Sequence, residues 1–334
     1  MEVKKYSPVI IPTLNRYEHF KRCLESLEQC TGATYTDVYI GLDYPPAEKY
    51  IEGWRKIDEY LQFKEAHNGF RKLLVRRRDH NCGTCKDGSN YSLLMEEVRL
   101  VSDTYIFSED DNEFSPCFLQ YMNKALTKFY DDDRIYIVCG YNYAMHFPEM
   151  YRNNFYFTRN GCPWGIAKWF HKQDKFIHYY NADFLRNAIR NENNYIFLKE
   201  RNPGVLYSII SQLKRGRLFG DSIMGLYSTL EDKYCVLPRL SMVRNWGNDG
   251  SGEHSPNNDK KRNEYYVSQE ISKEEDFEFS SDLFTYEPMY LEREKFHQKI
   301  ISLGAIRNLA KHIVFKLDML LLRKFNILIK SKYI

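Results

Sequence analysis

The stretch Thr104-Tyr-Ile-Phe-Ser-Glu-Asp-Asp-Asn112 carries a short apolar run directly into three consecutive acids. Such a run is typical of a buried strand, so Glu109–Asp111 would form a turn at the carboxyl end of that strand. Carboxylate oxygens are the ligands that hard divalent cations prefer. Alternatively, the acids belong to the start of a helix expected from Pro116, whose amino end favours negative charge. Their position directly after the strand favours a site.

The sequence on either side of this stretch alternates between strand-like and helix-like patterns. Strands are predicted at 8–12, 36–42, 72–76, 104–107 and 135–139, and helices at 17–29, 50–67, 88–101 and 116–130. This alternation is typical of βαβ units. The fold class predicted is therefore α/β, with a mostly parallel, Rossmann-like sheet flanked by helices.

Polar side chains follow the ends of four predicted strands, at Asn15-Arg16, Asp43, 76–79 and 109–111. In parallel sheets, ligands bind outside the carboxyl ends of the strands. We therefore expect these polar groups to meet at one edge of the sheet.

Composition excludes several classes of function. The 334 residues carry a net charge of +3, which is too small to attract nucleic acid, so no nucleic-acid partner is expected. The segment Met1–Lys5 does not resemble an export signal, so the eight cysteines are expected to be reduced and the protein cytoplasmic. Cys82-Gly-Thr-Cys85 is a lone pair, whereas a zinc site needs a second one. No apolar run approaches the roughly 18 residues of a membrane span.

The second half of the chain is less regular. It predicts helices over Ile166–His171 and Gly220–Leu230, a glycine-rich loop over 245–254 and a polar loop over 256–276. We expect one α/β domain in two halves, 1–140 and 141–295, followed by a C-terminal tail over 296–334.

Two motifs resemble glycosyltransferases of the GT-A fold. Val9-Ile-Ile-Pro-Thr-Leu-Asn-Arg16, followed by Phe20-Lys-Arg-Cys-Leu-Glu-Ser-Leu27, is similar to the opening of family 2 enzymes and of family 13 N-acetylglucosaminyltransferases. Glu109-Asp-Asp111 followed by Pro116-x-Phe118 resembles the E-D-D…P-D-F-F segment of family 13. The resemblance covers roughly residues 6–255, and it implies a GT-A fold that binds a nucleotide-sugar.

The resemblance also implies roles for single residues. Asp111 would bind Mn²⁺ or Mg²⁺, and Asp110 would lie near the ribose or the metal-bound waters. The other residues implied to border the nucleotide are Thr13, Asn15, Arg16, Asp43 and Arg78. The alternative for Arg76–Arg78 is a solvated basic edge of the sheet.

A transferase that inverts the sugar needs a carboxylate to take the proton of the acceptor hydroxyl. Asp221 is the candidate, because Gly220-Asp-Ser-Ile-Met-Gly225 resembles the W-D-D-W segment that carries the base in family 13. This chain departs from that pattern in having one acid where the family has two. The alternative for Asp221 is a helix N-cap, with Glu231-Asp232 as the fallback base.

The loop Asn248-Asp-Gly-Ser-Gly-Glu-His254 offers further ligands. Glycines allow a loop to approach phosphates closely and to donate its amides to them. His254 is a candidate metal ligand and Arg244 a candidate partner of the diphosphate. Candidate sugar platforms, each of which is equally typical of a core residue, are Trp164, Trp246 and Tyr141.

The C-terminal tail has a basic amphipathic pattern. One face would carry Leu309, Ile313, Leu317, Leu320 and Leu321, and the other Arg307, Lys311, His312, Lys316 and Arg323. This pattern suits a peripheral position on the inner face of an anionic membrane. The alternative is a helix packed on its own catalytic domain.

The resemblance therefore implies a metal-dependent hexosyl- or N-acetylhexosaminyltransferase. It would carry a sugar from a UDP-sugar to a glycan or lipid-linked acceptor, with inversion, in surface polysaccharide biosynthesis. Two alternatives remain: a nucleotidyltransferase of sugar phosphates, against which the glycine-free Thr13-Leu-Asn-Arg16 counts, and a non-catalytic sugar-binding protein of the same fold.

Overall fold

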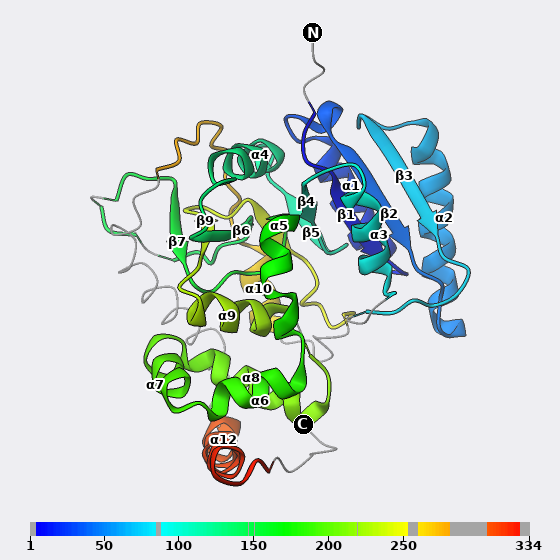
Figure 1. Ribbon diagram of the computed structural model, residues 1–334. Coiled ribbons are helices and arrows are strands. Elements are labelled where there is room, and N and C mark those ends of the chain that lie inside the picture. The colour runs from blue at the N-terminus through cyan, green and yellow to red at the C-terminus, as the bar shows by residue number, and fades with distance from the viewer. Residues whose placement is uncertain are drawn as a thin grey trace.

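The computed structural model describes residues 5–84, 88–145, 147–149, 151–218, 220–252, 260–280 and 306–327. Among these residues, eight strands form one sheet in the order β3-β2-β1-β4-β8-β6-β9-β7 (Figure 1). The strands are β1 (Val9–Thr13), β2 (Asp37–Leu42), β3 (Lys72–Arg77), β4 (Thr104–Phe107), β6 (Ile135–Cys139), β7 (Phe155–Thr158), β8 (Ile166–Trp169) and β9 (Tyr234–Pro238). β7 and β8 run against the direction shared by the others. The mostly parallel α/β sheet predicted from the sequence is confirmed.

Alternating side chains of the central strands bury both faces of this sheet. In β1, Val9 and Ile11 pack into one core and Ile10 into the other, and all three are fully buried. The first core is closed by α1 (Tyr17–Glu28), α2 (Ile51–Ala66) and α4 (Phe118–Lys128), and the second by α3 (Asn90–Arg99) and α5 (Phe170–Gln173). The sheet is therefore the middle layer of three.

The helix predicted over Ile166–His171 is wrong, because this segment begins with strand β8. Ile166 pairs with Phe107 of β4 on one side and with Cys139 of β6 on the other. This four-residue segment satisfies its backbone by pairing with both neighbouring strands, and it is too short to show the periodicity that would distinguish strand from helix. Helix α5 follows only at Phe170.

A helical layer lies below the sheet in Figure 1. It consists of α6 (Ala182–Arg190), α7 (Glu192–Arg201), α8 (Pro203–Arg215), α9 (Gly220–Leu230) and α12 (Ile306–Phe325). Helix α9 packs between the sheet and α8, and α12 packs on α6 and α8 at the lower end. None of the helices in the described part of the chain has the length and apolar character needed to cross a membrane.

The polar loop predicted over 256–276 is wrong for 260–267, which are helical, whereas 268–276 have no regular structure. Helix α10 (Lys260–Val267) occupies part of the segment, and beyond it Gln269 and Ser272 are buried. Each is held by a hydrogen bond to a distant part of the chain: the Gln269 side-chain amide donates to the carbonyl of Asn142, and the Ser272 amide donates to that of Ser241. A polar group that has a hydrogen-bond partner can be buried, so the polar composition of a segment does not by itself predict that it is exposed.

Candidate active site

The acidic turn joins β4 to a short second sheet. β4 ends at Phe107, and β5 (Asn112–Phe114) then pairs antiparallel with β10 (Val243–Asn245), with Asn112 opposite Asn245. Because β5 separates the turn from α4, the first turn of α4 holds none of these acids. The helix-start alternative for Glu109–Asp111 is therefore excluded, and the acids belong to the carboxyl edge of the main sheet.

Arg16 and Thr13 hold the acidic turn from β1. The guanidinium of Arg16 pairs with the carboxylate of Asp110 and lies 2.8 Å from Oδ2 of Asp111. The Thr13 hydroxyl donates to Oδ2 of Asp110 over 2.8 Å. Burial alone would lower the pKa of Arg16, but the charges of Asp110 and Asp111 and the bonds to them raise it overall. Two predicted residues thus meet the acidic turn, while their contact with a nucleotide stays a prediction.

Asp111 is enclosed from the opposite side by the segment that follows β10. Asn245 donates its side-chain amide to Oδ1 of Asp111 over 2.8 Å. The same Asn245 accepts, at its Oδ1, the Gly247 amide over 3.1 Å and the Asn248 side-chain amide over 3.0 Å. A Cβ on residue 247 would lie 2.0 Å from Oδ2 of Asp111. Only glycine leaves room for this carboxylate.

The site holds more negative than positive charge. Burial and then the charges of Asp111 and Asp221 raise the pKa of Glu109 well above its ordinary value, although Arg16 opposes the rise. Burial likewise raises the pKa of Asp111 against the influence of Arg16. One guanidinium therefore leaves these carboxylates incompletely neutralised, which is the electrostatic condition that suits a divalent cation.

Asp221 lies in the helical layer, close enough for its charge to act on the acidic turn. It lies in the first turn of α9 with an exposed side chain. Its charge acts on Glu109, and it also opposes the effect of burial on Lys168 of β8, whose pKa is lowered to about 8. The predicted base and the predicted metal-binding turn are thus electrostatic neighbours, contributed by α9 and by the end of β4.

Asp43 and Arg78 form the rim of the site at the ends of β2 and β3. The Asp43 carboxylate accepts the backbone amides of Tyr44, Cys82 and Gly83 over 2.8–2.9 Å. Nε of Arg78 donates to the side chain of Asn90 over 3.0 Å. Both predicted residues lie at the expected edge, where Asp43 orders the loop after β3. Their contact with a nucleotide stays a prediction.

The other two arginines of the 76–78 run face away from the site. Arg76 pairs with Glu97 of α3, and Arg77 pairs with Asp58 and Glu65 of α2. The solvated-edge interpretation therefore holds for these two residues and not for Arg78.

Arg244 and Trp246 are engaged by the second sheet. Nη1 of Arg244 lies 3.1 Å from Oε2 of Glu113, and the Trp246 indole donates to the same oxygen over 2.8 Å. Arg22 stacks on the Trp246 ring at 4.0 Å. Both residues therefore already have protein partners, and the predicted role of Arg244 at a diphosphate would compete with Glu113.

The remaining candidate residues lie in different kinds of position. Tyr141 is fully buried against Trp164, with ring centroids 4.7 Å apart, so it is a core residue and not a sugar platform. Trp164 is partly exposed. The Asn15 carbonyl accepts the amide of Tyr17 at the start of α1. His254 lies outside the described residues.

Sequence patterns missed Asn245, Gly247 and Lys168. The described residues hold no cluster of three His, Cys, Asp or Glu side chains arranged around a common point for a metal. The groups that would hold a cation here are Asp111 and the oxygens of a bound diphosphate, with water completing the shell, as is usual for Mg²⁺. Asp111 and Glu109 are the buried carboxylates whose charged forms such a cation would stabilise.

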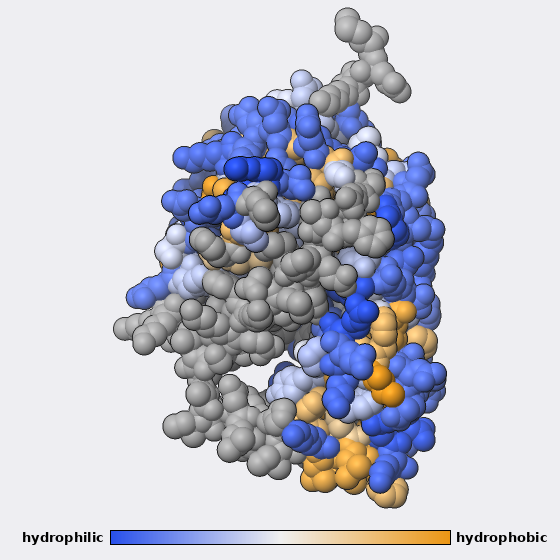
Figure 2. Space-filling model, turned by 90° about the vertical axis from the view of Figure 1, so that its left-hand side faces the viewer, coloured by the Kyte–Doolittle hydropathy of each residue, from blue (hydrophilic) through white to orange (hydrophobic). Residues whose placement is uncertain are grey.

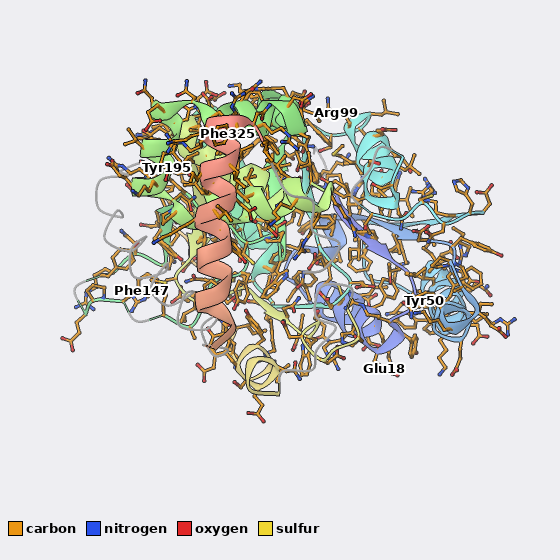
Figure 3. All side chains as sticks on the ribbon, turned by 90° about the horizontal axis from the view of Figure 1, so that it is seen from below. Glu18, Tyr50, Arg99, Phe147, Tyr195 and Phe325 are labelled. Carbon is orange, nitrogen blue, oxygen red and sulfur yellow. The ribbon has the colours of Figure 1, made fainter. Side chains whose placement is uncertain are left out.

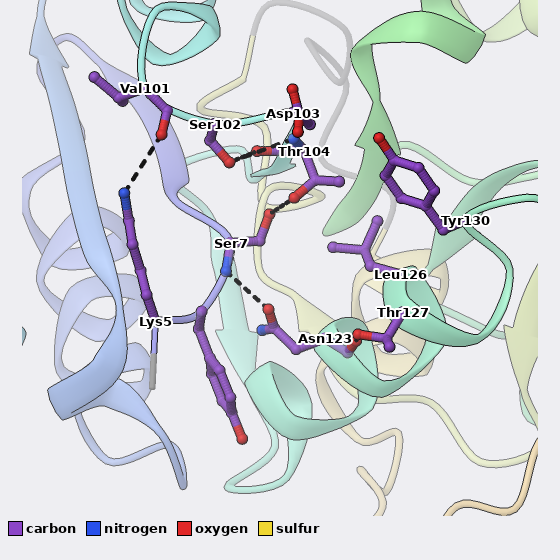
Figure 4. Close-up of a pocket in the computed structure, with 11 residues that line it drawn as sticks. Lys5, Ser7, Val101, Ser102, Asp103, Thr104, Asn123, Leu126, Thr127 and Tyr130 are labelled. Atoms are coloured by element: carbon purple, nitrogen blue, oxygen red, sulfur yellow. Dashed lines mark hydrogen bonds between the residues drawn. The ribbon is translucent and has the colours of Figure 1, made fainter. Parts of the chain in front are cut away.

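A separate cavity of about 360 Å³ lies at the opposite edge of the sheet, where β1 and β4 begin (Figure 4). Ser7 and Thr104 share a hydrogen bond of 2.6 Å there, and the Ser7 amide donates to Asn123. These lining groups are thus bonded to one another, and the cavity lies at the strand ends opposite the acidic turn.

By sequence, the chain matches no known protein family and none of the curated proteins. In structure it is distantly similar to the mannosyltransferase PcManGT from Pyrobaculum calidifontis in complex with GDP-Man and Mn²⁺, with 11% identity and a TM-score of 0.38 over 69% of this chain and 70% of that one. It is also similar to residues 1–349 of TarS from S. aureus, with 12% identity and a TM-score of 0.41 over 96% of this chain and 81% of that one. The same TarS segment in complex with UDP gives 14% identity and a TM-score of 0.35 over 75% and 73%. Similarity this distant does not establish what the protein does. The evidence for its function is the arrangement of side chains at the site.

Proposed function

We propose that this protein is a metal-dependent glycosyltransferase of the GT-A type that uses a UDP-sugar donor. The observation that carries the proposal is the buried acidic turn after β4, where Arg16, Thr13 and Asn245 hold Asp110 and Asp111. Asp221 is close enough to this turn for its charge to raise the pKa of Glu109. A sugar-binding protein without catalytic activity does not require an exposed carboxylate near a buried acidic turn.

The donor would lie along the strand ends. Thr13, Asn15 and Arg16 border its nucleotide, together with Asp43, Arg78 and Asp110, and Asp111 holds Mn²⁺ or Mg²⁺ against the diphosphate. When bound, the cation neutralises the charge that develops on the departing diphosphate. Arg16 fixes Asp110 and Asp111 relative to each other through its two ion pairs, so the turn keeps its shape without rearrangement.

Asp221 would act as the general base. Its carboxylate takes the proton of the acceptor hydroxyl while that oxygen forms a bond to the anomeric carbon of the sugar. The bond from the same carbon to the diphosphate breaks, and the nucleoside diphosphate leaves with the electron pair. A single displacement of this kind inverts the anomeric configuration.

The acceptor we propose is a glycan or lipid-linked saccharide of surface polysaccharide synthesis. Exposure of Asp221 supports an acceptor that approaches from solvent rather than a small buried one. The sugar is proposed to be a hexose or an N-acetylhexosamine.

The test is a screen of UDP- and GDP-sugars for release of nucleoside diphosphate with Mn²⁺, with and without chelator. We expect Asp221→Asn to lower kcat by at least about 100-fold with donor binding unchanged, and Asp111→Ala to abolish the Mn²⁺-dependent binding of UDP. Asp183→Asn is the matched control, because Asp183 is an exposed acid in the first turn of α6. Equal turnover by Asp111→Ala would refute the metal role, and full activity of Asp221→Asn would remove the base.

A further inference from the structure

Helix α12 packs on the protein through a face other than its leucine-rich one, which the sequence pattern assigned to a membrane surface or, alternatively, to packing on the domain. Met319 and Leu322 are buried against the helical layer, and the Phe315 ring contacts Tyr207 of α8 with centroids 5.3 Å apart. Figure 3, which looks at the molecule from below, shows α12 lying across α6–α8 with Phe325 near Tyr195. The tail is therefore docked on its own domain.

A buried ion pair fixes this orientation. Nζ of Lys214 in α8 lies 2.6 Å from Oδ2 of Asp318, and both side chains are less than a tenth exposed. Asp318 is the only acid between His297 and Ile334, a segment with eight Lys and Arg residues. Docking thus removes the single negative charge of the tail from its outer surface.

The outward face of α12 and the residues just after it expose large apolar side chains. The exposed fractions are 51% for Leu317, 48% for Leu320 and 63% for Phe325 in the helix, and 51% for Ile327 beyond its end. Lys316 and Lys324 are exposed beside them. Figure 2 shows hydrophobic residues gathered at the lower end of the molecule, where α12 lies in Figure 1.

From these observations we propose that the outer face of docked α12 binds the surface of an anionic lipid bilayer. Large apolar side chains that face solvent together mark a contact surface. Lys316 and Lys324 lie beside this surface, Asp318 is paired internally, and the exposed Glu192 of α7 is paired with Arg323. The net charge of these groups is positive, so an anionic surface complements it. Half-exposed leucines between lysines are suited to insertion at the level of lipid headgroups. This binding to lipid is separate from the proposed transferase activity and does not require a bound sugar donor.

The experiment is flotation of the full chain with vesicles of phosphatidylcholine alone or with phosphatidylglycerol. We expect partition to the anionic vesicles only. Leu317→Asn with Leu320→Asn should weaken it roughly tenfold or more, and Lys316→Gln with Lys324→Gln should weaken it by about fivefold per lysine. One matched control is Leu100→Asn with Val101→Asn, whose side chains are 84% and 52% exposed in the turn after α3. The other is Lys72→Gln with Lys128→Gln, two exposed lysines elsewhere.

Three outcomes would overturn the proposal. One is the absence of binding to anionic vesicles, and another is unchanged binding by the two-leucine variant. The third is a dimer in light scattering that the two-leucine variant converts to a monomer without vesicle binding, which would make the face an interface between copies. Release of nucleoside diphosphate in the absence of acceptor is measured in parallel. Loss of vesicle binding with unchanged release would then contradict the membrane proposal and not the transferase proposal.

Discussion

At the scale of single residues, the site depends on how closely the backbone approaches Asp111. Gly247 lies against this carboxylate, with no room for a Cβ. The side chains on either side of Gly247, Trp246 and Asn248, are both held by hydrogen bonds, to Glu113 and Asn245. The loop therefore cannot retreat without breaking these bonds, and a larger residue at position 247 must displace Asp111.

We expect Gly247→Ala to lower kcat/KM by at least about 100-fold, since a shift of about 1 Å in a positioned group can cost that much. The fold should persist in circular dichroism, because the loop lies outside the cores. The matched control is Gly204→Ala in α8, where an added Cβ meets no atom within 4 Å. Wild-type activity in Gly247→Ala would show that Asp111 need not stay in place.

Part of this site could be predicted from the sequence. Thr13, Arg16 and Asp110–Asp111 follow strands whose patterns are clear, and the rule that parallel strands share a carboxyl edge brings them together. Asn245 and Gly247 could not be found this way. They reach Asp111 through the pairing of β5 with β10, two three-residue strands that lie far apart in the chain, and strands this short carry no periodicity.

At the scale of elements, helices and strands of the first half were predicted well and those of the second half less so. β1 to β4 follow the apolar runs predicted for them, whereas β8 was predicted as a helix and α10 as a loop. Helix α12 was predicted as a helix, but its docked face was not. The pattern of apolar residues pointed to the leucine-rich face as the contact face of the helix. In the structure the docked face instead includes Asp318, which is buried in an ion pair with Lys214.

This buried pair leads to a prediction about α12. Removing one partner should destabilise the protein by about 3 kcal/mol, because the other charge stays buried without compensation. The double variant Lys214→Met with Asp318→Leu should recover most of that loss. Urea unfolding of both single variants and the double variant measures the coupling energy.

The matched control is the pair of Lys175 with Asp133. It has the same 2.6 Å separation, but its side chains are 46% and 69% exposed. Its removal should change stability by less than about 1 kcal/mol. Purely additive losses at Lys214 and Asp318 would mean that the two charges do not interact in solution.

At the scale of the whole molecule, the acidic turn links stability to pH and to ligands. The pKa of Asp111 is raised in the folded protein, mainly by burial. Between the ordinary pKa of an aspartate and this raised value, the folded state binds more protons than the unfolded one. The metal-free protein should therefore lose stability as pH rises through that window. Asp111→Asn should reduce this loss and leave the part due to Glu109, whose pKa is also raised by burial.

Ligands should reverse the effect. With Mn²⁺ and UDP together at about 100 times their Kd, we expect the Tm at pH 7 to rise by about 5 °C in the wild type and not in Asp111→Asn. Differential scanning fluorimetry with each ligand alone and with both makes the comparison. An equal rise in Asp111→Asn would place the cation elsewhere.

The pairing of β5 with β10 also predicts how the two strands change together in evolution. Asn112 and Asn245 share a hydrogen bond of 3.1 Å, and Glu113 and Arg244 share an ion pair, although 133 positions separate Asn112 from Asn245. A substitution in one strand leaves a polar group without its partner in the other. In an alignment of relatives, positions 112 with 245 and 113 with 244 should therefore covary, so that this pair of strands is inherited as one unit.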